Sequence, residues 1–308
     1  MATPDIGTTI SDGYSRGIER LSSTIGSSAV AAGIVGVVAG IVQELQARAT
    51  GVSFSDFGSM FRVSTSLEGS DMAVFNLLAA VSTLVELVVG FAALAIFAGA
   101  MHRARHGASE EIPEPGAMTG ALSSMARLLM PKLGVLAALS VAGPLAGTVF
   151  NVLGGLVSLV TAIALTIFSV RWIYAPVIIG SGEAEGDAGY ERSEATVAGD
   201  WWKTFGVLIV VGLAIGLPIA IVASVVGAIL PTVFLSAFAT AAIGALGYYS
   251  LGAAALDSAW AQVESAPVDA GATSMPPTGV APVVPAVPDA VSPDVPTDNP
   301  PHHQGPFS

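Results

Sequence analysis

Two charged side chains lie inside long apolar segments, and they have the clearest potential for chemistry. Glu86 falls at the middle of segment 72–100, and Arg171 lies inside segment 154–179. A carboxylate at the centre of a bilayer costs on the order of 3 kcal/mol, so Glu86 should face protein or water, or be protonated. It could bind a cation, relay protons or pair with Arg171, whose side chain leans toward the depth of Glu86 if both helices run in one direction. We treat Glu86 and Arg171 as a candidate intramembrane polar pair.

A second interpretation applies to Arg171, because Trp172 and Tyr174 follow it. Arginine, tryptophan and tyrosine gather where a helix leaves the hydrocarbon, and arginine can extend its head group to the lipid headgroups. We favour this interfacial anchor for Arg171, with Trp172 and Tyr174 beside it. Trp201 and Trp202 are predicted to anchor the start of the next apolar segment in the same way.

Other residues that could support catalysis or metal binding are absent or scattered. The chain contains no cysteine, which excludes disulfides, thiol catalysis and cysteine metal sites. It also contains no HExxH motif. We expect His102 and His106 to be solvated beside arginines at the end of segment 72–100, and the adjacent His302 and His303 to be solvated as well. The sequence therefore predicts no catalytic, cofactor-binding or metal-binding residue, and a chain that is not an enzyme.

The composition is that of a membrane protein. Of the 308 residues, 53% are hydrophobic and only 11% are charged, whereas a soluble domain carries about 25% charged residues. A helix that crosses about 30 Å of hydrocarbon needs about 20 apolar residues. Such segments must be helical, because lipid offers no partner for an open backbone N–H or C=O. We predict an all-α polytopic membrane bundle of about six helices, at 25–43, 72–100, 133–152, 154–179, 203–228 and 230–256.

The chain is predicted to have three parts. Residues 1–24 include a short amphipathic piece expected to lie along the membrane interface, and residues 25–260 hold the six-helix domain. Residues 261–308 form a Pro-rich, acidic tail, since eleven of the 19 prolines lie in 265–308. That composition cannot bury enough apolar surface to offset its ordering entropy, so we predict a disordered tail.

The connections between spans predict further features. Short links make 133–179 and 203–256 helical hairpins. An interfacial helix is predicted at 117–130. Another is predicted in loop 44–71, from its aromatic spacing, with an irregular loop as the alternative.

The charge balance is strongly acidic, with 23 Asp and Glu against 11 Lys and Arg, of which only two are lysines. Acidic, lysine-poor surfaces keep their hydration in a salt-loaded cytoplasm, so the composition favours a halophile of haloarchaeal type. A GC-rich actinobacterium is the alternative. The same acidity argues against nucleic acid and against anionic headgroups as electrostatic partners.

The basic residues predict the orientation. Eight of them fall on the N-terminal side of the six spans, and only Arg48 and Arg62 fall on the other side. Because basic residues concentrate in cytoplasmic loops, both termini should lie in the cytoplasm of a multi-pass cell-membrane protein.

One stretch carries a family resemblance. Residues 171–179, with the sequence RWIYAPVII, are followed by an acidic, glycine-containing loop at 180–189, an amphipathic piece at 190–199 and the sequence WWKTF at 201–205. This pattern resembles uncharacterised prokaryotic six-helix membrane proteins and is similar to the membrane domain of glycerophosphodiester phosphodiesterases. The resemblance covers about residues 10–260 of the printed sequence and implies the six-helix architecture. It does not imply phosphodiesterase activity, because the matching residues all lie in the membrane part.

Two functions of different class follow from these observations. The favoured one is a non-enzymatic integral membrane protein with an accessory or scaffold role, whose tail contacts soluble partners. The alternative is a small-solute or ion transporter or channel with a polar site at Glu86.

The predicted orientation can be tested with single cysteines in this cysteine-free chain. We expect a membrane-impermeant thiol reagent to label Ser66→Cys in intact cells and to leave Ser292→Cys unlabelled until the cells are opened. The reverse pattern would overturn the orientation.

Overall fold

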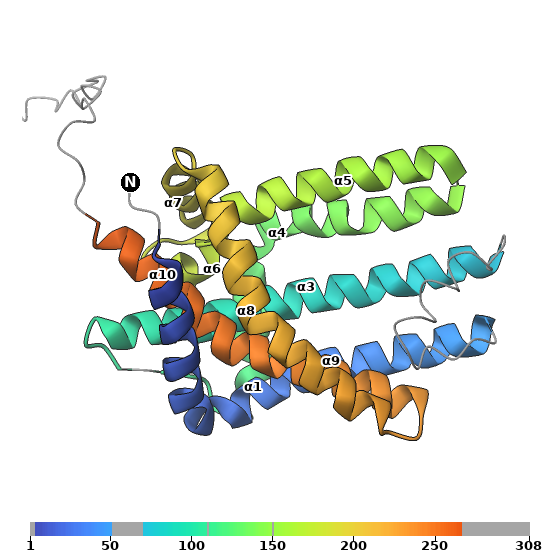
Figure 1. Cartoon of the computed structure of the whole chain (residues 1–308), viewed down its shortest axis with the longest axis horizontal. Helices are drawn as coiled ribbons and strands as arrows, with labels where there is room; N and C mark the ends of the chain where they lie inside the picture. Colours follow the sequence, from blue (N-terminus) through green and yellow to red (C-terminus); the bar gives the residue numbers. More distant parts are fainter. Residues whose placement is uncertain (1–3, 51–69, 110, 150, 267–308) are drawn as a thin grey trace, which may run out of the picture. The chain divides into compact units, whose positions relative to one another are not determined.

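The computed structural model describes residues 4–50, 70–109, 111–149 and 151–266, which belong to one compact unit, Met1–Val268. Every regular element in these residues is a helix (Figure 1). The elements are α1 (Ile6–Thr50), α3 (Ser70–Arg105), α4 (Met118–Val149), α5 (Asn151–Arg171), α6 (Ala175–Ser181), α7 (Gly186–Val197), α8 (Trp201–Ala228), α9 (Val233–Gly247), a π-helical turn (Tyr248–Gly252) and α10 (Ala253–Glu264).

The predicted class, a helical protein of membrane type, is confirmed at the level of helix length and composition. Five helical runs are long and apolar enough to cross a bilayer: Ile6–Ala49, Ala73–Arg105, Met118–Ala142, Trp201–Ala228 and Val233–Glu264. A sixth candidate is a bent pair, Leu156–Arg171 with Ala175–Ser181, whose helices meet at 42°. The count reaches six only if this pair crosses as one span.

Several predicted boundaries need correction. The first helix begins at Ile6, well before the predicted start of the span at residue 25, and α10 continues to Glu264, beyond the predicted start of the tail at residue 261. Contacts within the protein explain both extensions, since the side-chain amide oxygen of Gln262 accepts a hydrogen bond from the backbone N–H of Asp5 (2.6 Å). The interfacial helix predicted in loop 44–71 falls mainly on residues outside the described ranges, as does the tail from residue 267.

The N-terminal part of α1 packs on the protein. The hydroxyl group of Tyr14 donates a hydrogen bond to the backbone carbonyl of Ala214 in α8 (2.7 Å). A Cβ atom at Gly13 would lie 3.0 Å from the Cβ of Ala255 in α10, so the two backbones approach closely there. Figure 1 shows this part of α1, in dark blue, turned away from the lighter remainder of the helix. The predicted interfacial piece is thus part of α1, held by contacts with α8 and α10.

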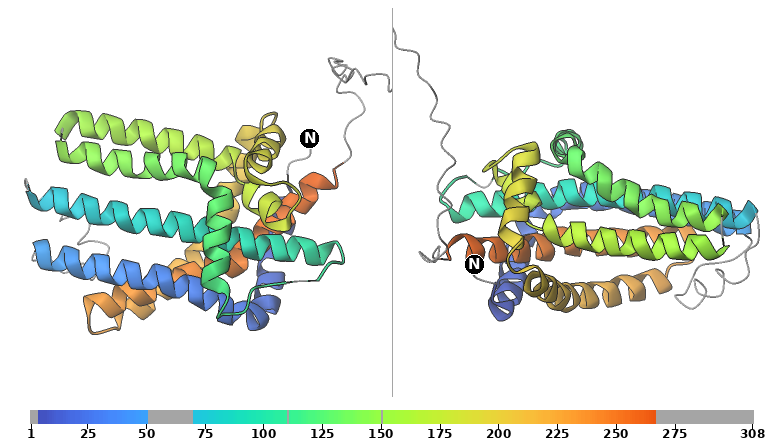
Figure 2. Two further views of the ribbon diagram at one scale, coloured as in Figure 1. Left: turned by 180° about the vertical axis from the view of Figure 1, so that it is seen from behind. Right: turned by 90° about the horizontal axis from the view of Figure 1, so that it is seen from above.

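The two predicted hairpins are present. The chain turns back between α4 and α5 and between α8 and α9, and each pair is in contact. Figure 2 shows the first part of α4, in dark green, running across α3 before the helix turns to lie beside α5. The helix predicted at 117–130 therefore exists, continuous with the span that follows.

Two glycines allow the backbones of α6 and α3 to touch where these helices cross. A Cβ atom at Gly99 of α3 would overlap the backbone of Gly180, and one at Gly180 would overlap the carbonyl of Ala95. The guanidinium group of Arg103 also donates a hydrogen bond to the Gly180 carbonyl. This crossing fixes the end of the bent pair against α3.

We expect Gly99→Ala to destabilise the protein by about 1–3 kcal/mol or more, because overpacking forces backbone shifts. The matched control is Gly134→Ala in α4, where an added Cβ meets no atom within 4 Å. Alanine there should be neutral or stabilising by up to about 1 kcal/mol, since it is the better helix former. Thermal unfolding in detergent, followed by circular dichroism, compares the two; equal melting temperatures would contradict the proposed crossing.

Candidate functional site

The predicted pair of Glu86 and Arg171 is not formed, so the prediction is wrong. The carboxylate of Glu86 accepts a hydrogen bond from the hydroxyl group of Ser82, one turn earlier in α3 (2.8 Å). The guanidinium group of Arg171 lies 3.8 Å from the carboxylate of Glu194 in α7. Arg171 is the last residue of α5, and α7 passes nearer to it than Glu86 does.

Glu86 instead lines a cavity of about 420 Å³ between α3 and the π-helical turn. Tyr248 and Tyr249 of that turn line the same cavity, together with Gly90. The Glu86 side chain is exposed in the described structure. A carboxylate with this surrounding remains a candidate for ion contact.

Two of the four predicted anchors are buried inside the protein. Trp172 and Tyr174 are each only 3% exposed, so the prediction that they contact the membrane interface is wrong. The indole N–H of Trp172 donates a hydrogen bond to Glu194 (3.1 Å), and its ring meets the ring of Tyr190 edge-on. By contrast, Trp202 is 75% exposed, which suits an anchor.

Helix α7 supports the break between α5 and α6. The buried hydroxyl group of Ser193 donates a hydrogen bond to the carbonyl of Arg171 (2.8 Å) and accepts one from the N–H of Tyr174 (3.2 Å). The phenol group of Tyr190 donates to the carbonyl of Leu129 in α4 (2.8 Å). Burial raises the pKa of Tyr190, so the phenol stays neutral and keeps this donor.

An ionic cluster that the sequence analysis missed is centred on Asp257 of α10, whose side chain is fully buried. Its Oδ2 atom lies 2.9 Å from Nη1 of Arg16 and 2.8 Å from Nη2 of Arg105. Its Oδ1 atom lies 3.1 Å from Nδ1 of His102. A carboxylate is tolerated in the interior when it is paired and hydrogen-bonded, and these contacts provide both. One carboxylate therefore joins α1, α3 and α10.

A second set of charges continues the cluster from the other ring nitrogen of His102. That atom, Nε2, lies 2.8 Å from Oε1 of Glu183, in the turn between α6 and α7. Arg192 of α7 pairs with Glu183 (2.6 Å) and approaches Glu264 of α10 (3.6 Å), and its guanidinium group lies over the ring of Trp260. The cluster thus reaches α6 and α7 as well.

The solvation predicted for His102 is wrong, because the residue is only 3% exposed and carboxylates bind both of its ring nitrogens. His106, one helical turn later, is exposed as predicted. Two features of the sequence could have indicated this cluster: the four-residue spacing of the two histidines, and the position of Asp257 directly after a predicted span.

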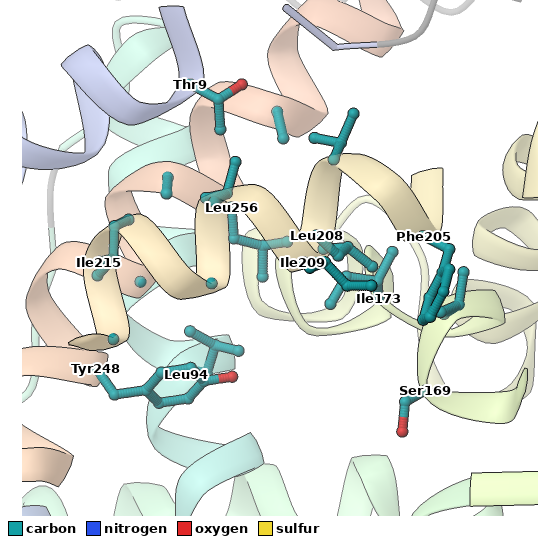
Figure 3. Close-up of a pocket in the computed structure, with 18 of the residues that line it drawn as sticks. Thr9, Leu94, Ser169, Ile173, Phe205, Leu208, Ile209, Ile215, Tyr248 and Leu256 are labelled. Atoms are coloured by element: carbon teal, nitrogen blue, oxygen red, sulfur yellow. The ribbon is translucent and has the colours of Figure 1, made fainter. Parts of the chain in front are cut away.

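A large apolar cavity of about 650 Å³ lies between α5, α8 and α10 (Figure 3). Leu94, Ile173, Leu208 and Ile215 are among its apolar lining residues, and the hydroxyl groups of Ser169 and Tyr248 are among its few polar groups. Gly212 and Gly216 of α8 also line it, and a Cβ at either would meet no atom within 4 Å. These glycines therefore leave open space where larger side chains would fill it.

A second cavity of about 620 Å³ shares two lining residues, Thr166 and Phe205, with the first. Arg171, Trp201 and Trp202 line this second cavity. The Arg171 side chain is 51% exposed. The indole nitrogen of Trp201 is buried without a hydrogen-bond partner among the described residues. The crevice between α5 and α8 therefore has an apolar interior, and its second cavity is lined by a cation and two tryptophans.

The comparisons with protein-family models, with curated proteins and with solved structures gave no match. The resemblance to the membrane domain of glycerophosphodiester phosphodiesterases therefore stays a prediction from the sequence.

We expect Asp257→Asn to cost about 3–5 kcal/mol, because it leaves the cations of the cluster without their buried counter-charge. The control is Glu191→Gln on the exposed face of α7, which should change stability by less than about 0.5 kcal/mol. The measurement is the yield of folded protein and its melting temperature in detergent. A variant as stable as the parent would show that the cluster does not hold the helices together.

Proposed function

We propose that this chain is a non-enzymatic integral membrane protein that binds a membrane lipid in the crevice between α5 and α8. The observation that carries the proposal is the apolar cavity of about 650 Å³, kept open by Gly212 and Gly216.

The size and lining of the cavity support a lipid-like occupant. Sites for small molecules are concave, mostly apolar and about 300–1,000 Å³ in volume. A cavity with so few polar groups offers water too few partners to hold it. Helices α5 and α8 both qualify as membrane-crossing by length and composition, α5 as part of the bent pair, so the cavity lies beside hydrocarbon. The apolar molecule available at that depth is an acyl or isoprenoid chain.

The mouth of the crevice supports an anionic headgroup. The guanidinium group of Arg171, whose side chain is half exposed, offers several donors that suit phosphate oxygens. The strong net negative charge of the chain opposes long-range attraction to anionic lipids, whereas a single guanidinium at the mouth acts at contact distance. The contact between Arg171 and the headgroup therefore decides the preference for anionic lipids.

We propose the number of spans and their orientation as well. The bent pair crosses as one span, which gives six spans with both termini in the cytoplasm, as the basic residues favour. An accessory role in the cell membrane fits a protein that holds a lipid and presents an acidic tail to soluble partners. The tail lies outside the described residues, so its role in this proposal rests on its composition alone.

One observation favours transport as a second candidate. Tyr248 lines both the large apolar cavity and the cavity of Glu86, so both spaces border the π-helical turn. Ion flux in proteoliposomes that disappears in Glu86→Gln would favour transport. Its absence across a panel of ions would leave lipid binding.

We expect Gly212→Leu to displace the lipid, because Gly212 lines the cavity, its added Cβ meets no atom within 4 Å and the rest of the side chain occupies cavity space. The control is Gly134→Leu in α4, where an added Cβ also meets open space, but outside the lining of the cavity. Lipid that co-purifies with the protein is counted per chain by mass spectrometry, with the melting temperature as a check on folding. The parent and Gly134→Leu should retain lipid, and Gly212→Leu should lose most of it.

A further variant tests the headgroup. Arg171→Gln should retain the apolar chain but lower the share of anionic lipids among those bound. Equal lipid content in the parent and Gly212→Leu would overturn the proposal.

A further inference from the structure

The free end of the ionic cluster has the geometry of a metal site. His102 lies in the last turn of α3 and His106 directly follows the helix, four residues later, with their ring centroids separated by 4.6 Å. Two histidines at this spacing on one helical face commonly bind one metal ion. The exposed side chain of His106 places this pair at the aqueous end of the helix.

A carboxylate from another helix completes the set. One oxygen of Glu264, the last residue of α10, lies 3.6 Å from Nε2 of His102 and 3.6 Å from Nε2 of His106. Zn–N and Zn–O bonds of about 2.0–2.2 Å place two ligands of a tetrahedral zinc ion roughly 3.4 Å apart, so these separations need little adjustment. One ligand atom from each of the three residues lies within 4.8 Å of those from the other two.

The surroundings of His102 match those of a metal-ligating histidine. Such a histidine donates its other ring N–H to a carboxylate, which fixes the tautomer and the ring orientation. Here Nδ1 lies 3.1 Å from the buried carboxylate of Asp257, which is itself held by two arginines. The Nε2 atom is then the nitrogen left for a metal, and it lies 2.8 Å from Glu183 and 3.6 Å from Glu264.

The charges around the imidazoles also suit a cation. The carboxylate of Glu183 lies 2.8 Å from Nε2 of His102, which is a hydrogen-bond distance, so Glu183 lies beside the three candidate ligands. Glu183 and Glu264 bring two negative charges, of which Arg192 offsets one. A cation is thus favoured between the carboxylates and the imidazoles.

We propose that His102, His106 and Glu264 bind one divalent transition-metal ion, such as Zn²⁺, beside the carboxylate of Glu183. The imidazole ligands and the absence of cysteine select borderline ions over soft ones. The site is independent of the lipid crevice, which it meets only through the opposite face of α10.

The site links segments that are distant in the sequence. His102 and His106 come from the end of α3 and the residue that follows it, and Glu264 comes from α10. A bound ion therefore adds a bond between these elements at their aqueous end, and it should stabilise the folded chain, because the separated ligands of the unfolded chain bind less well.

The test uses full-length protein purified in detergent without a polyhistidine tag and freed of metal with a chelator. Zn²⁺ and Co²⁺ are titrated separately, with the stoichiometry measured by elemental mass spectrometry and the Co²⁺ environment by visible absorption. We expect one ion per chain, a tetrahedral Co²⁺ spectrum and a higher melting temperature with metal.

Two variants test the proposed ligands, and a third serves as the control. His106→Ala and Glu264→Gln remove ligands that are not fully buried, and each should weaken Zn²⁺ binding by more than about 100-fold, the upper end of the effect of losing an outer-shell partner. His102→Gln is not used, because His102 also pairs with Asp257. A tail variant with both His302→Ala and His303→Ala should keep the parent affinity.

The outcomes separate cleanly. Unchanged affinity in His106→Ala or Glu264→Gln, loss of binding in the tail variant, or no saturable binding to the parent would each overturn the metal site. Melting temperatures of the metal-free variants, compared with that of the metal-free parent, identify any unfolding; His106→Gln replaces His106→Ala if alanine unfolds the chain.

Discussion

The buried carboxylate of Asp257 is the contact on which the arrangement of helices depends. It draws Arg16 of α1 and both Arg105 and His102 of α3 onto α10. These helices come from opposite ends of the chain, so local helix propensity cannot bring them together. Apolar packing alone selects poorly among possible helix partners, because lipid tails are as apolar as leucine. A carboxylate that must be paired supplies the missing specificity, since any other arrangement leaves a charge unpaired in the interior.

Helix α10 separates two environments by the faces it presents. Ala255, Leu256 and Ala259 line the apolar crevice. Asp257 and Glu264 face the ionic cluster instead. The chain therefore places an apolar cavity and an ionic cluster on opposite sides of one helix. A shift of α10 would therefore change both the apolar crevice and the ionic cluster.

The sequence predicted what depends on local pattern. Length and hydropathy predicted long apolar helices of membrane type, and the short links around residues 150 and 230 predicted the two hairpins that are present. The pattern could not show partners, because an ion pair depends on which helices meet. Arg171 was therefore placed at the membrane interface, with Glu86 as its candidate partner, although Glu194 lies beside it; Trp172 was also placed at the interface, although α7 buries it. The same limit hid the cluster, since His102 and Asp257 are 155 residues apart.

The π-helical turn at Tyr248–Gly252 sets the phase of the helix that follows. Such a turn holds one residue more than an α-helical turn, and each residue of an α-helix advances it by about 100°. Every side chain of α10 is thus rotated by about that angle from where an uninterrupted helix would place it. Without that rotation, the direction of Asp257 would be taken by a neighbouring residue, Leu256 or Ser258. One extra residue in the backbone thus decides which chemical face of α10 meets α3.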